Sequence, residues 1–289
     1  MRSALKRILK EYHSDDMNFS QRWVVVTGAS SGLGKAIATG LAAKHQANLI
    51  LVARRLDKLD ALKQQLESTH GIKCESIAAD LSDLTQIDML FQKSIENRDI
   101  YAVILNAGIT YFGEHQQLPW QQFQQLLTTN VTGIVKAVEH YLPYLQVKQQ
   151  SGGIMLVSSV AGLLPVPYQA AYSGSKAFIT HYGLGLNEEL RYDDCSLTVF
   201  SPGGIATEMT HSSGLDAQFE GSAVLQSPEQ CAAEAIQAMK TRHALYVPGW
   251  INKFQVFGAR LLPRSLLVFF AGNLYRKALA AKVKQEASH

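Results

Sequence analysis

Apolar residues in this chain fall into two alternating arrangements, short continuous runs and longer segments with helical spacing. The runs are rich in β-branched residues and predict strands over residues 23–27, 48–53, 74–79, 100–105, 153–157, 196–200 and 244–247. Between them, helical spacing predicts helices over residues 34–44, 56–67, 84–97, 120–145, 170–191 and 228–240. Continuous apolar strands alternating with helices are typical of a parallel sheet covered on both faces. We therefore predict a doubly wound α/β fold with about seven strands.

This alternating pattern occupies one uninterrupted part of the chain. No internal repeat or low-complexity linker divides residues 22–248, so we predict one domain there. Residues 1–21 form an N-terminal extension, and residues 249–289 form a basic, amphipathic, helical C-terminal extension. Ser227 is expected to cap the last helix of the domain, and Pro119 to stand in the first turn of the helix over residues 120–145.

The charge is unevenly distributed, although the formal net charge of the whole chain is only +3. From residue 251 onward there are seven Lys or Arg residues and one Glu, interspersed with aromatic and aliphatic residues. This composition fits a solvated helix, a segment that lies on an anionic membrane, a cap over a binding pocket, or a homodimer or homotetramer interface. These alternatives stay open. No recognition motif accompanies the cations, so we expect no nucleic-acid partner.

Cysteine usage and the absence of long apolar segments indicate the compartment. Cys74, Cys195 and Cys231 are isolated and lack metal-ligand spacing, so we interpret them as reduced packing residues and expect no metal site. No segment has the apolar run of a signal peptide or the roughly 18 apolar residues of a membrane span. We expect a cytoplasmic protein, with peripheral membrane association through the C-terminal extension as an alternative.

A glycine-rich turn joins the first predicted strand to the first helix. Residues 27–34 read Thr-Gly-Ala-Ser-Ser-Gly-Leu-Gly. Glycines permit positive φ and close backbone approach, and a helix start offers free N–H groups to an anion. The turn therefore predicts a dinucleotide pyrophosphate site, although its G-x-x-x-G-x-G spacing differs from the usual G-x-G-x-x-G. A turn without a ligand is the plainer alternative.

The end of the second strand bears on which dinucleotide binds. An acidic residue there holds the ribose 2′-hydroxyl of NAD, whereas a cation accommodates the 2′-phosphate of NADP. This chain has Arg54 and Arg55 at that point and no acid. We therefore predict NADP(H), against the alternative of two solvated arginines at a helix start.

Tyr172 and Lys176 stand four residues apart, which places both side chains on one face of a helix. A free phenol has a pKa of about 10 and is a poor acid–base catalyst near neutrality. A nearby cation favours the phenolate. We expect Lys176, together with an oxidised nicotinamide, to lower the pKa of Tyr172 enough for proton transfer to a carbonyl oxygen. An ordinary tyrosine–lysine pair on a helix surface is the alternative, which Ser159 and Asn130 argue against.

In their order along the chain, these motifs resemble the short-chain dehydrogenase/reductase family over about residues 22–247. A second asparagine that many members carry is replaced by Leu105. The resemblance implies a Rossmann-type fold and a nicotinamide-dependent oxidoreductase. The matching motifs are the turn 27–34, Asp80-Leu81, Asn106-Ala107-Gly108, Asn130, Ser159, Tyr172-x-x-x-Lys176, and Pro202-Gly203 with Thr207.

The resemblance also implies roles for these residues. Ser159 donates to the substrate carbonyl, Tyr172 acts as acid and base, Lys176 assists it, and Asn130 bends its helix and holds a water. Strand alternation sends Ser158 to the opposite face from Ser159. Asp80 is expected to bind the adenine, with a plain helix cap as the alternative. The implied cofactor contacts are Gly28, Ser30, Ser31, Gly32, Leu33, Gly34, Arg54, Arg55, Asp80, Leu81, Asn106, Ala107, Gly108, Tyr172, Lys176, Pro202, Gly203, Ile205 and Thr207.

The expected substrate pocket lies between residues 163–168, which are mainly apolar, and residues 205–226. We therefore expect an NADP(H)-dependent oxidoreductase that interconverts a ketone or aldehyde and an alcohol on a hydrophobic substrate. A catalytically silent NADP-binding regulatory or scaffold protein is the alternative.

Overall fold

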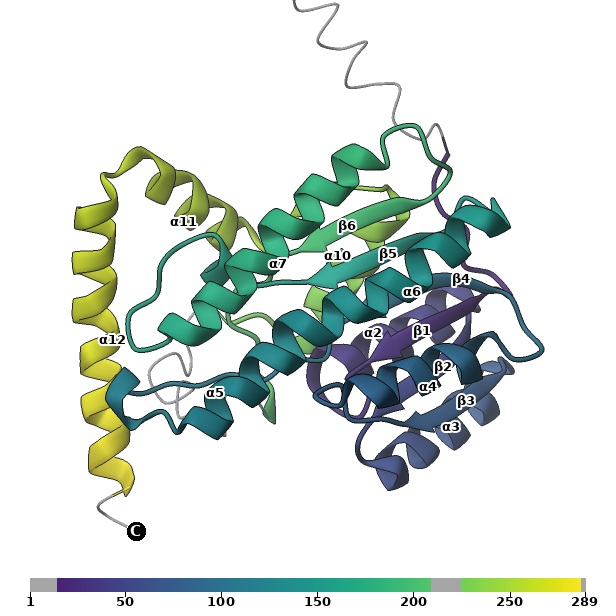
Figure 1. The fold of residues 1–289 in the computed structure, drawn as a ribbon, viewed down its shortest axis with the longest axis horizontal. Coiled ribbons are helices and arrows are strands. Elements are labelled where there is room, and N and C mark those ends of the chain that lie inside the picture. Colours follow the sequence, from purple (N-terminus) through teal and green to yellow (C-terminus); the bar gives the residue numbers. More distant parts are fainter. Residues whose placement is uncertain (1–14, 209–224, 287–289) are drawn as a thin grey trace, which may run out of the picture.

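The computed structural model describes residues 15–208 and 225–286, except for the side chains of Arg260 and residues 284–286. Seven parallel strands form one sheet in the order β3-β2-β1-β4-β5-β6-β7 (Figure 1), as the sequence predicts. The strand order reverses at β1, which lies between β2 and β4, and such a reversal leaves a crevice at the carboxyl ends of the strands. The strands are β1 (Trp23–Thr27), β2 (Asn48–Ala53), β3 (Cys74–Ala78), β4 (Ile100–Leu105), β5 (Gly153–Val157), β6 (Ser196–Phe200) and β7 (Leu245–Tyr246).

Helices cover both faces of this sheet and bury two separate apolar cores. One core packs α2 (Gly32–His45), α3 (Leu56–His70) and α10 (Pro228–Lys240) against the sheet. The other packs α4 (Leu84–Ile95), α6 (Gly133–Lys148) and α7 (Ala170–Glu189). Neighbouring residues of one strand belong to different cores, with Val24 in the first and Val25 in the second. This alternation explains why the strands read as continuous apolar runs.

Several element boundaries differ from the predictions. Helix α2 begins at Gly32, two residues early, because the glycine turn runs directly into the helix. Pro119 was predicted in the first turn of its helix, but it precedes α5 (Trp120–Leu127) as the N-cap residue. The predicted helix over residues 120–145 is divided by a π-helical turn over Thr128–Thr132. Ser227 caps α10 by accepting a hydrogen bond from the Gln230 N–H, which confirms that prediction.

Both extensions contact the domain. Met17 and Phe19 are buried in the first core, so the packing of the domain begins before residue 22. The C-terminal extension contains two helices, α11 (Trp250–Leu261) and α12 (Arg264–Glu286). In Figure 1, α12 runs along one edge of the molecule beside the loop that precedes α5. None of the described helices is both long and apolar enough to span a membrane.

Two shorter helical turns connect elements near the carboxyl ends of the strands, over His115–Gln117 and Val160–Gly162. The three cysteines are buried free thiols, which confirms their interpretation as packing residues. Most of the predicted pocket border over residues 205–226, namely residues 209–224, lies outside the described residues.

Candidate active site

The glycine turn is shaped by positive backbone angles and by close contacts at its end. Gly28 and Gly32 have φ angles of +69° and +53°, a region that favours glycine. A Cβ on Gly34 would lie 2.3 Å from the carbonyl oxygen of Gly28 and 2.6 Å from Nδ2 of Asn106. Only glycine therefore fits where α2 meets the turn. The first turn of α2 contains no acidic residue, and the N-cap Ser31 makes no capping bond with its side chain. These N–H groups suit a pyrophosphate.

Hydrogen bonds tie the ends of β1 and β4 together beside this turn. The Thr27 hydroxyl accepts bonds from the N–H groups of Asn106 and Ala107, both at 3.0 Å. Asn106 Nδ2 donates to the Thr27 carbonyl at 3.0 Å. The strand-end segment 106–108 thus forms one wall of the crevice, as the family resemblance implies. Leu33 faces inward, at 7% exposure, so only its backbone is available to a ligand.

The two serines after β5 have different surroundings, as the predicted alternation requires. Ser158 is buried and donates to the Lys176 carbonyl at 2.9 Å, and its hydroxyl lies 2.7 Å from that of Thr180. Ser159 instead points to Tyr172, with which it forms a hydrogen bond. Ser158 therefore ties the end of β5 to the interior of α7, and Ser159 belongs to the candidate site.

Lys176 is almost fully buried, at 3% exposure, and its ammonium lies 5.9 Å from the centre of the Tyr172 ring. Its Nζ donates to the carbonyl of Val157, the last residue of β5, at 2.8 Å. Burial lowers the pKa of Lys176 to about 8. The lysine is therefore held close to the phenol by a strand-end carbonyl, and its charge is costly at neutral pH.

The pKa of Tyr172 differs from the sequence prediction. Burial raises the pKa of this phenol, and the hydrogen bond with Ser159 acts in the lowering direction. The predicted lowering by Lys176 together with an oxidised nicotinamide concerns the complex with the cofactor and stays a prediction.

Asn130 lies in the π-helical turn, which interrupts the helix where the resemblance implies a bend. Its amide is fully buried and pairs with Ile109, accepting from the N–H at 2.9 Å and donating to the carbonyl at 2.8 Å. A Cβ on Gly108 would lie 3.2 Å from Asn130 Oδ1 and 3.3 Å from Lys176 Nζ. Asn130 and Lys176 therefore converge on the same backbone position. The water that the resemblance implies at Asn130 stays a prediction.

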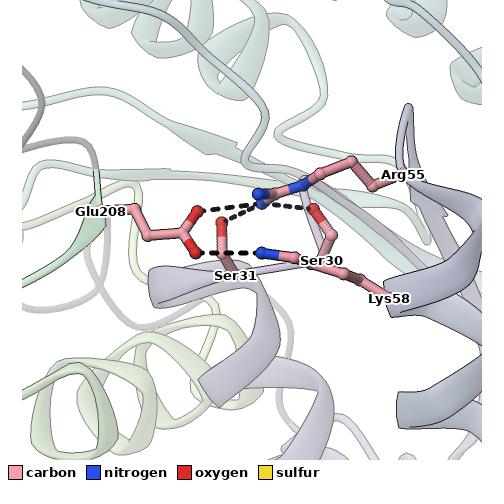
Figure 2. A network of polar contacts seen from close by, with 5 residues as sticks. All are labelled: Ser30, Ser31, Arg55, Lys58 and Glu208. Atoms are coloured by element: carbon pink, nitrogen blue, oxygen red, sulfur yellow. Dashed lines mark hydrogen bonds and ion pairs between the residues drawn. The ribbon is translucent and has the colours of Figure 1, made fainter.

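The turn after β2 places one of the two predicted arginines at the glycine turn. Arg55 Nη2 donates to the hydroxyls of Ser30 and Ser31 at 3.2 and 3.0 Å (Figure 2). It also pairs with Glu208 at 3.0 Å, and Lys58 pairs with the same carboxylate at 3.2 Å. Arg54 is exposed and takes no part in this network. A carboxylate bound by two cations and near two hydroxyls shows that this corner accommodates an anion.

Asp80 and Leu81 stand just past β3. Asp80 Oδ1 accepts from the N–H and hydroxyl of Ser82 at 2.9 and 2.8 Å, whereas Asp83 caps α4. The alternative that Asp80 is only a helix cap is therefore wrong. Leu81 packs against the second core, and its carbonyl would lie 2.5 Å from a Cβ on Gly133. Adenine binding by Asp80 stays a prediction.

The segment after β6 closes the other side of the crevice. A Cβ on Gly203 would lie 2.3 Å from Oδ1 of Asn252, a buried residue of α11. Thr207 packs its methyl group over the glycine turn, 3.1 Å from where a Cβ on Gly32 would stand. Pro202 accepts from the Ser159 hydroxyl at 3.4 Å, and Ile205 is bridged to Gln226. Pro202 and Thr207 thus contact residues of the candidate site, whereas the cofactor contacts of all four residues stay predictions.

Helix α12 reaches this site, which no motif indicates. Tyr275 packs edge-on against Phe112, with ring centres 6.1 Å apart. Burial raises the pKa of Tyr275, and Tyr172 is close enough for its charge to add to the rise. Arg276 donates to the Tyr168 hydroxyl at 3.2 Å, and Lys282 to the Phe112 carbonyl at 3.3 Å. Among the alternatives for the C-terminal extension, the structure therefore places α12 over the substrate side of the site.

A cavity of about 570 Å³ lies between α12 and the loops that precede α5 and α7. Ala170 and Ala171 line it, so the cavity adjoins Tyr172 without containing it. Its walls include Tyr168, as predicted, and Tyr111, which was not. Among the described residues, no group of three or more His, Cys, Asp or Glu side chains is arranged to hold a metal ion.

Comparison with known proteins identifies relatives of the chain. The family model described as short chain dehydrogenase matches residues 22–218. The chain is 31% identical over 206 residues to 17-beta-hydroxysteroid dehydrogenase type 3 of Mus musculus, covering 71% of this chain and 67% of that protein. It is 28% identical over 261 residues to inactive hydroxysteroid dehydrogenase-like protein 1 of Homo sapiens, covering 85% and 77%. The chain spans 52 to 77% of the length of the first curated relatives.

Solved structures support the same relationship. The short-chain dehydrogenase from Sphingobium yanoikuyae, solved in complex with NADPH, superposes with a TM-score of 0.74 at 26% sequence identity. The superposition covers 83% of this chain and 94% of that one. The glycine turn and the anion-binding corner at Arg55 therefore belong to a fold that, in this relative, binds NADPH.

Proposed function

This chain belongs to the short-chain dehydrogenase family, and we propose that it is an NADP(H)-dependent oxidoreductase that interconverts a ketone or aldehyde and an alcohol. One observation carries the proposal. Asn130, Ser159 and the α7 pair Tyr172 and Lys176 come from three separate segments and gather where β4 and β5 end, beside the glycine turn. Such a group beside a dinucleotide cradle suits carbonyl chemistry.

The residues of this chain have separate proposed roles in cofactor binding and in proton transfer. When bound, the cofactor supplies or accepts the hydride at the carbonyl carbon. The turn 28–34 would hold its pyrophosphate, and Arg55 the 2′-phosphate. Tyr172 gives its phenolic proton to the carbonyl oxygen, and Ser159 donates a hydrogen bond to the same oxygen as negative charge develops there. Lys176, whose pKa of about 8 lies near neutrality, is suited to return a proton toward the phenol.

We propose a hydrophobic substrate that enters beside α12. The cavity next to Tyr172 is bordered by Pro167, Val268 and Phe269, and Tyr275 of α12 lies near the phenol. The name of the mouse relative refers to a steroid, which is a hydrophobic alcohol or ketone. Steroids, 3-oxoacyl thioesters and other lipid-like ketones are therefore the substrates to test first.

The Tyr172→Phe variant tests the mechanism. The phenyl ring keeps the packing but has no proton to donate, so we expect turnover to be lost while NADPH still binds. Turnover is followed by NADPH absorbance across the ketone panel, and binding by NADPH fluorescence. Near-normal turnover in Tyr172→Phe would refute the mechanism. A wild-type protein that binds NADPH but reduces no ketone in the panel would favour the silent, regulatory alternative. The human relative is named as inactive.

The outer side of α11 supports a proposal about where the protein works. Trp250, Phe254, Phe257 and Leu261 recur at helical spacing on one side of the helix and are 62 to 78% exposed. Asn252 on the opposite side is buried. Contiguous exposed apolar residues of this size mark a binding surface.

The charges of the extension favour an anionic membrane as the partner of this surface. Residues 250–283 contain six Lys or Arg residues and no Asp or Glu. A two-fold contact between two copies of this extension would bring cations against cations, whereas anionic headgroups complement them. Phe269 is exposed and also lines the cavity, so the proposed membrane face adjoins the substrate entrance. A homodimer or homotetramer through other surfaces stays a prediction.

Vesicle flotation tests this surface. We expect wild-type protein to float with vesicles that contain anionic lipid and not with purely zwitterionic vesicles. The Phe254→Ser/Phe257→Ser double variant should lose binding. Trp120→Ser, which removes a 69% exposed aromatic residue from α5, is the matched control and should still bind. Sedimentation of the double variant as a smaller species, without any vesicle binding by wild type, would show a protein interface instead.

A further inference from the structure

The corner at Arg55, proposed to bind the 2′-phosphate, already binds an anion that belongs to the chain. Glu208 lies directly after Thr207, and its two carboxylate oxygens pair with different cations (Figure 2). Arg55 binds Oε2 at 3.0 Å and Lys58 binds Oε1 at 3.2 Å. The carboxylate therefore bridges the start of α3 and the segment after β6, which are far apart in the sequence.

The donors around Glu208 match those that a phosphate monoester needs. Arg55 reaches the Ser30 and Ser31 hydroxyls at 3.2 and 3.0 Å, so two hydroxyls and two cations face one small space. Guanidinium, ammonium and hydroxyl donors at hydrogen-bond distance are the usual partners of phosphate oxygens. Hydrogen bonds from Arg55 and then Lys58 hold the pKa of Glu208 below its usual value, so the carboxylate is charged at neutral pH.

Thr207, the residue before Glu208, lies over the glycine turn. The methyl group of Thr207 is 3.1 Å from where a Cβ on Gly32 would stand, directly over the turn. Residues 207 and 208 thus cover the two places where a dinucleotide would put its pyrophosphate and its 2′-phosphate. A bound cofactor and this arrangement of Glu208 compete for the same donors.

We propose that Glu208 is an internal counter-anion that competes with the 2′-phosphate of NADP(H), and that Lys58 is the second cation that recognises this phosphate. The proposal rests on the proposed NADP(H) function. Glu208 pairs with both Arg55 and Lys58 and offsets one of their two charges until a phosphate replaces it. A ligand without the phosphate gains nothing from displacing Glu208, so the pair Lys58–Glu208 affects NADP(H) and leaves NAD(H) nearly unchanged.

The magnitude follows from the exposure of the pair. The side chains of Arg55 and Lys58 are both 42% exposed and that of Glu208 is 58% exposed. Exposed ion pairs contribute little because water and salt screen them, and the usual range corresponds to roughly a two- to fivefold change in an equilibrium constant. Removing the competitor should tighten binding of a phosphate ligand by that factor, and removing Lys58 should weaken it by a similar or larger factor.

Binding of 2′,5′-ADP and 5′-AMP to the full chain, measured by calorimetry, isolates the phosphate. We expect Glu208→Gln to bind 2′,5′-ADP about two- to fivefold more tightly than wild type, and Lys58→Gln to bind it more weakly. Neither variant should change the affinity for 5′-AMP. Asp57→Asn is the control, because it removes one negative charge from an exposed residue of α3 that lies outside the network.

The outcomes separate this inference from the proposed function. If wild type prefers 2′,5′-ADP to 5′-AMP but Glu208→Gln equals Asp57→Asn, the counter-anion role is refuted and NADP(H) binding stands. An unchanged affinity in Lys58→Gln likewise refutes the role of Lys58. If wild type shows no preference for 2′,5′-ADP, both the NADP(H) assignment and this inference are wrong.

Discussion

The buried lysine offers a quantitative test of the site in the cofactor-free protein. Lys176 is 3% exposed, and burial lowers its pKa from 10.5 to about 8. This difference corresponds to a cost of about 3 kcal/mol for keeping the ammonium charged in the folded protein. Below pH 8 both the folded and the unfolded chain hold the proton, so the full cost is present. Between pH 8 and 10.5 only the unfolded chain keeps it, so this part of the stability rises with pH.

Replacement of Lys176 by Met removes this titration while it keeps a side chain of similar length. The variant also loses the 2.8 Å bond to the Val157 carbonyl, but that loss is a pH-independent offset. The free energy of unfolding of wild type, minus that of Lys176→Met, should rise by about 2 to 3 kcal/mol between pH 7 and pH 10.

The assay is urea unfolding of both proteins at several pH values, with circular dichroism as the probe. Other groups titrate in both proteins, so their contributions cancel in the difference. A difference that stays flat across this range would show that the ammonium is not destabilised. The proposed role of Lys176 near neutral pH would then lose its basis.

Two further changes test the assignment of neighbouring residues. Ser159→Ala should lower kcat by roughly a hundredfold. Ser158→Ala should mainly lower the free energy of unfolding, by about 1 kcal/mol, because it removes a buried hydroxyl that bonds the Lys176 carbonyl and the Thr180 hydroxyl. Steady-state rates and urea unfolding check both, and equal losses of kcat would contradict the division of roles. Arg55→Asp should reduce kcat/KM for NADPH by roughly tenfold or more, because it loses charge-assisted bonds to the cofactor. Arg54→Asp should have a much smaller effect. The reverse order would show that the arginine contacts in Figure 2 are not those that bind the cofactor.

The sheet was predictable because each of its strands is buried on both faces. Such strands read as unbroken apolar runs, and β1 illustrates this with Val24 and Val25 in opposite cores. The turn 28–34 was predictable because its requirement is local, since only glycine fits at Gly34. The π-helical turn was predicted as a bend through the family resemblance, which placed Asn130 inside a helix.

The parts that the sequence did not predict depend on contacts between distant segments. Glu208 and Lys58 are 150 residues apart, and neither belongs to a motif. Met17 and Phe19 occupy the core although the strand pattern begins at Trp23. The pKa of Tyr172 rises because burial outweighs the hydrogen bond from Ser159, and burial is a property of the folded chain.

Support for both sides of the site comes from beyond the region that the family model matches. The match ends at residue 218, yet Asn252 packs against Gly203 and Tyr275 stands near Tyr172. Asn252 is itself fixed, because its Nδ2 donates to the Pro248 carbonyl at 2.9 Å. The Pro202–Gly203 turn, expected against the nicotinamide, and the entrance beside α12 are therefore both shaped by the C-terminal extension. We therefore expect the residues shared with the family to carry the proposed chemistry, and this extension to influence which substrates reach it.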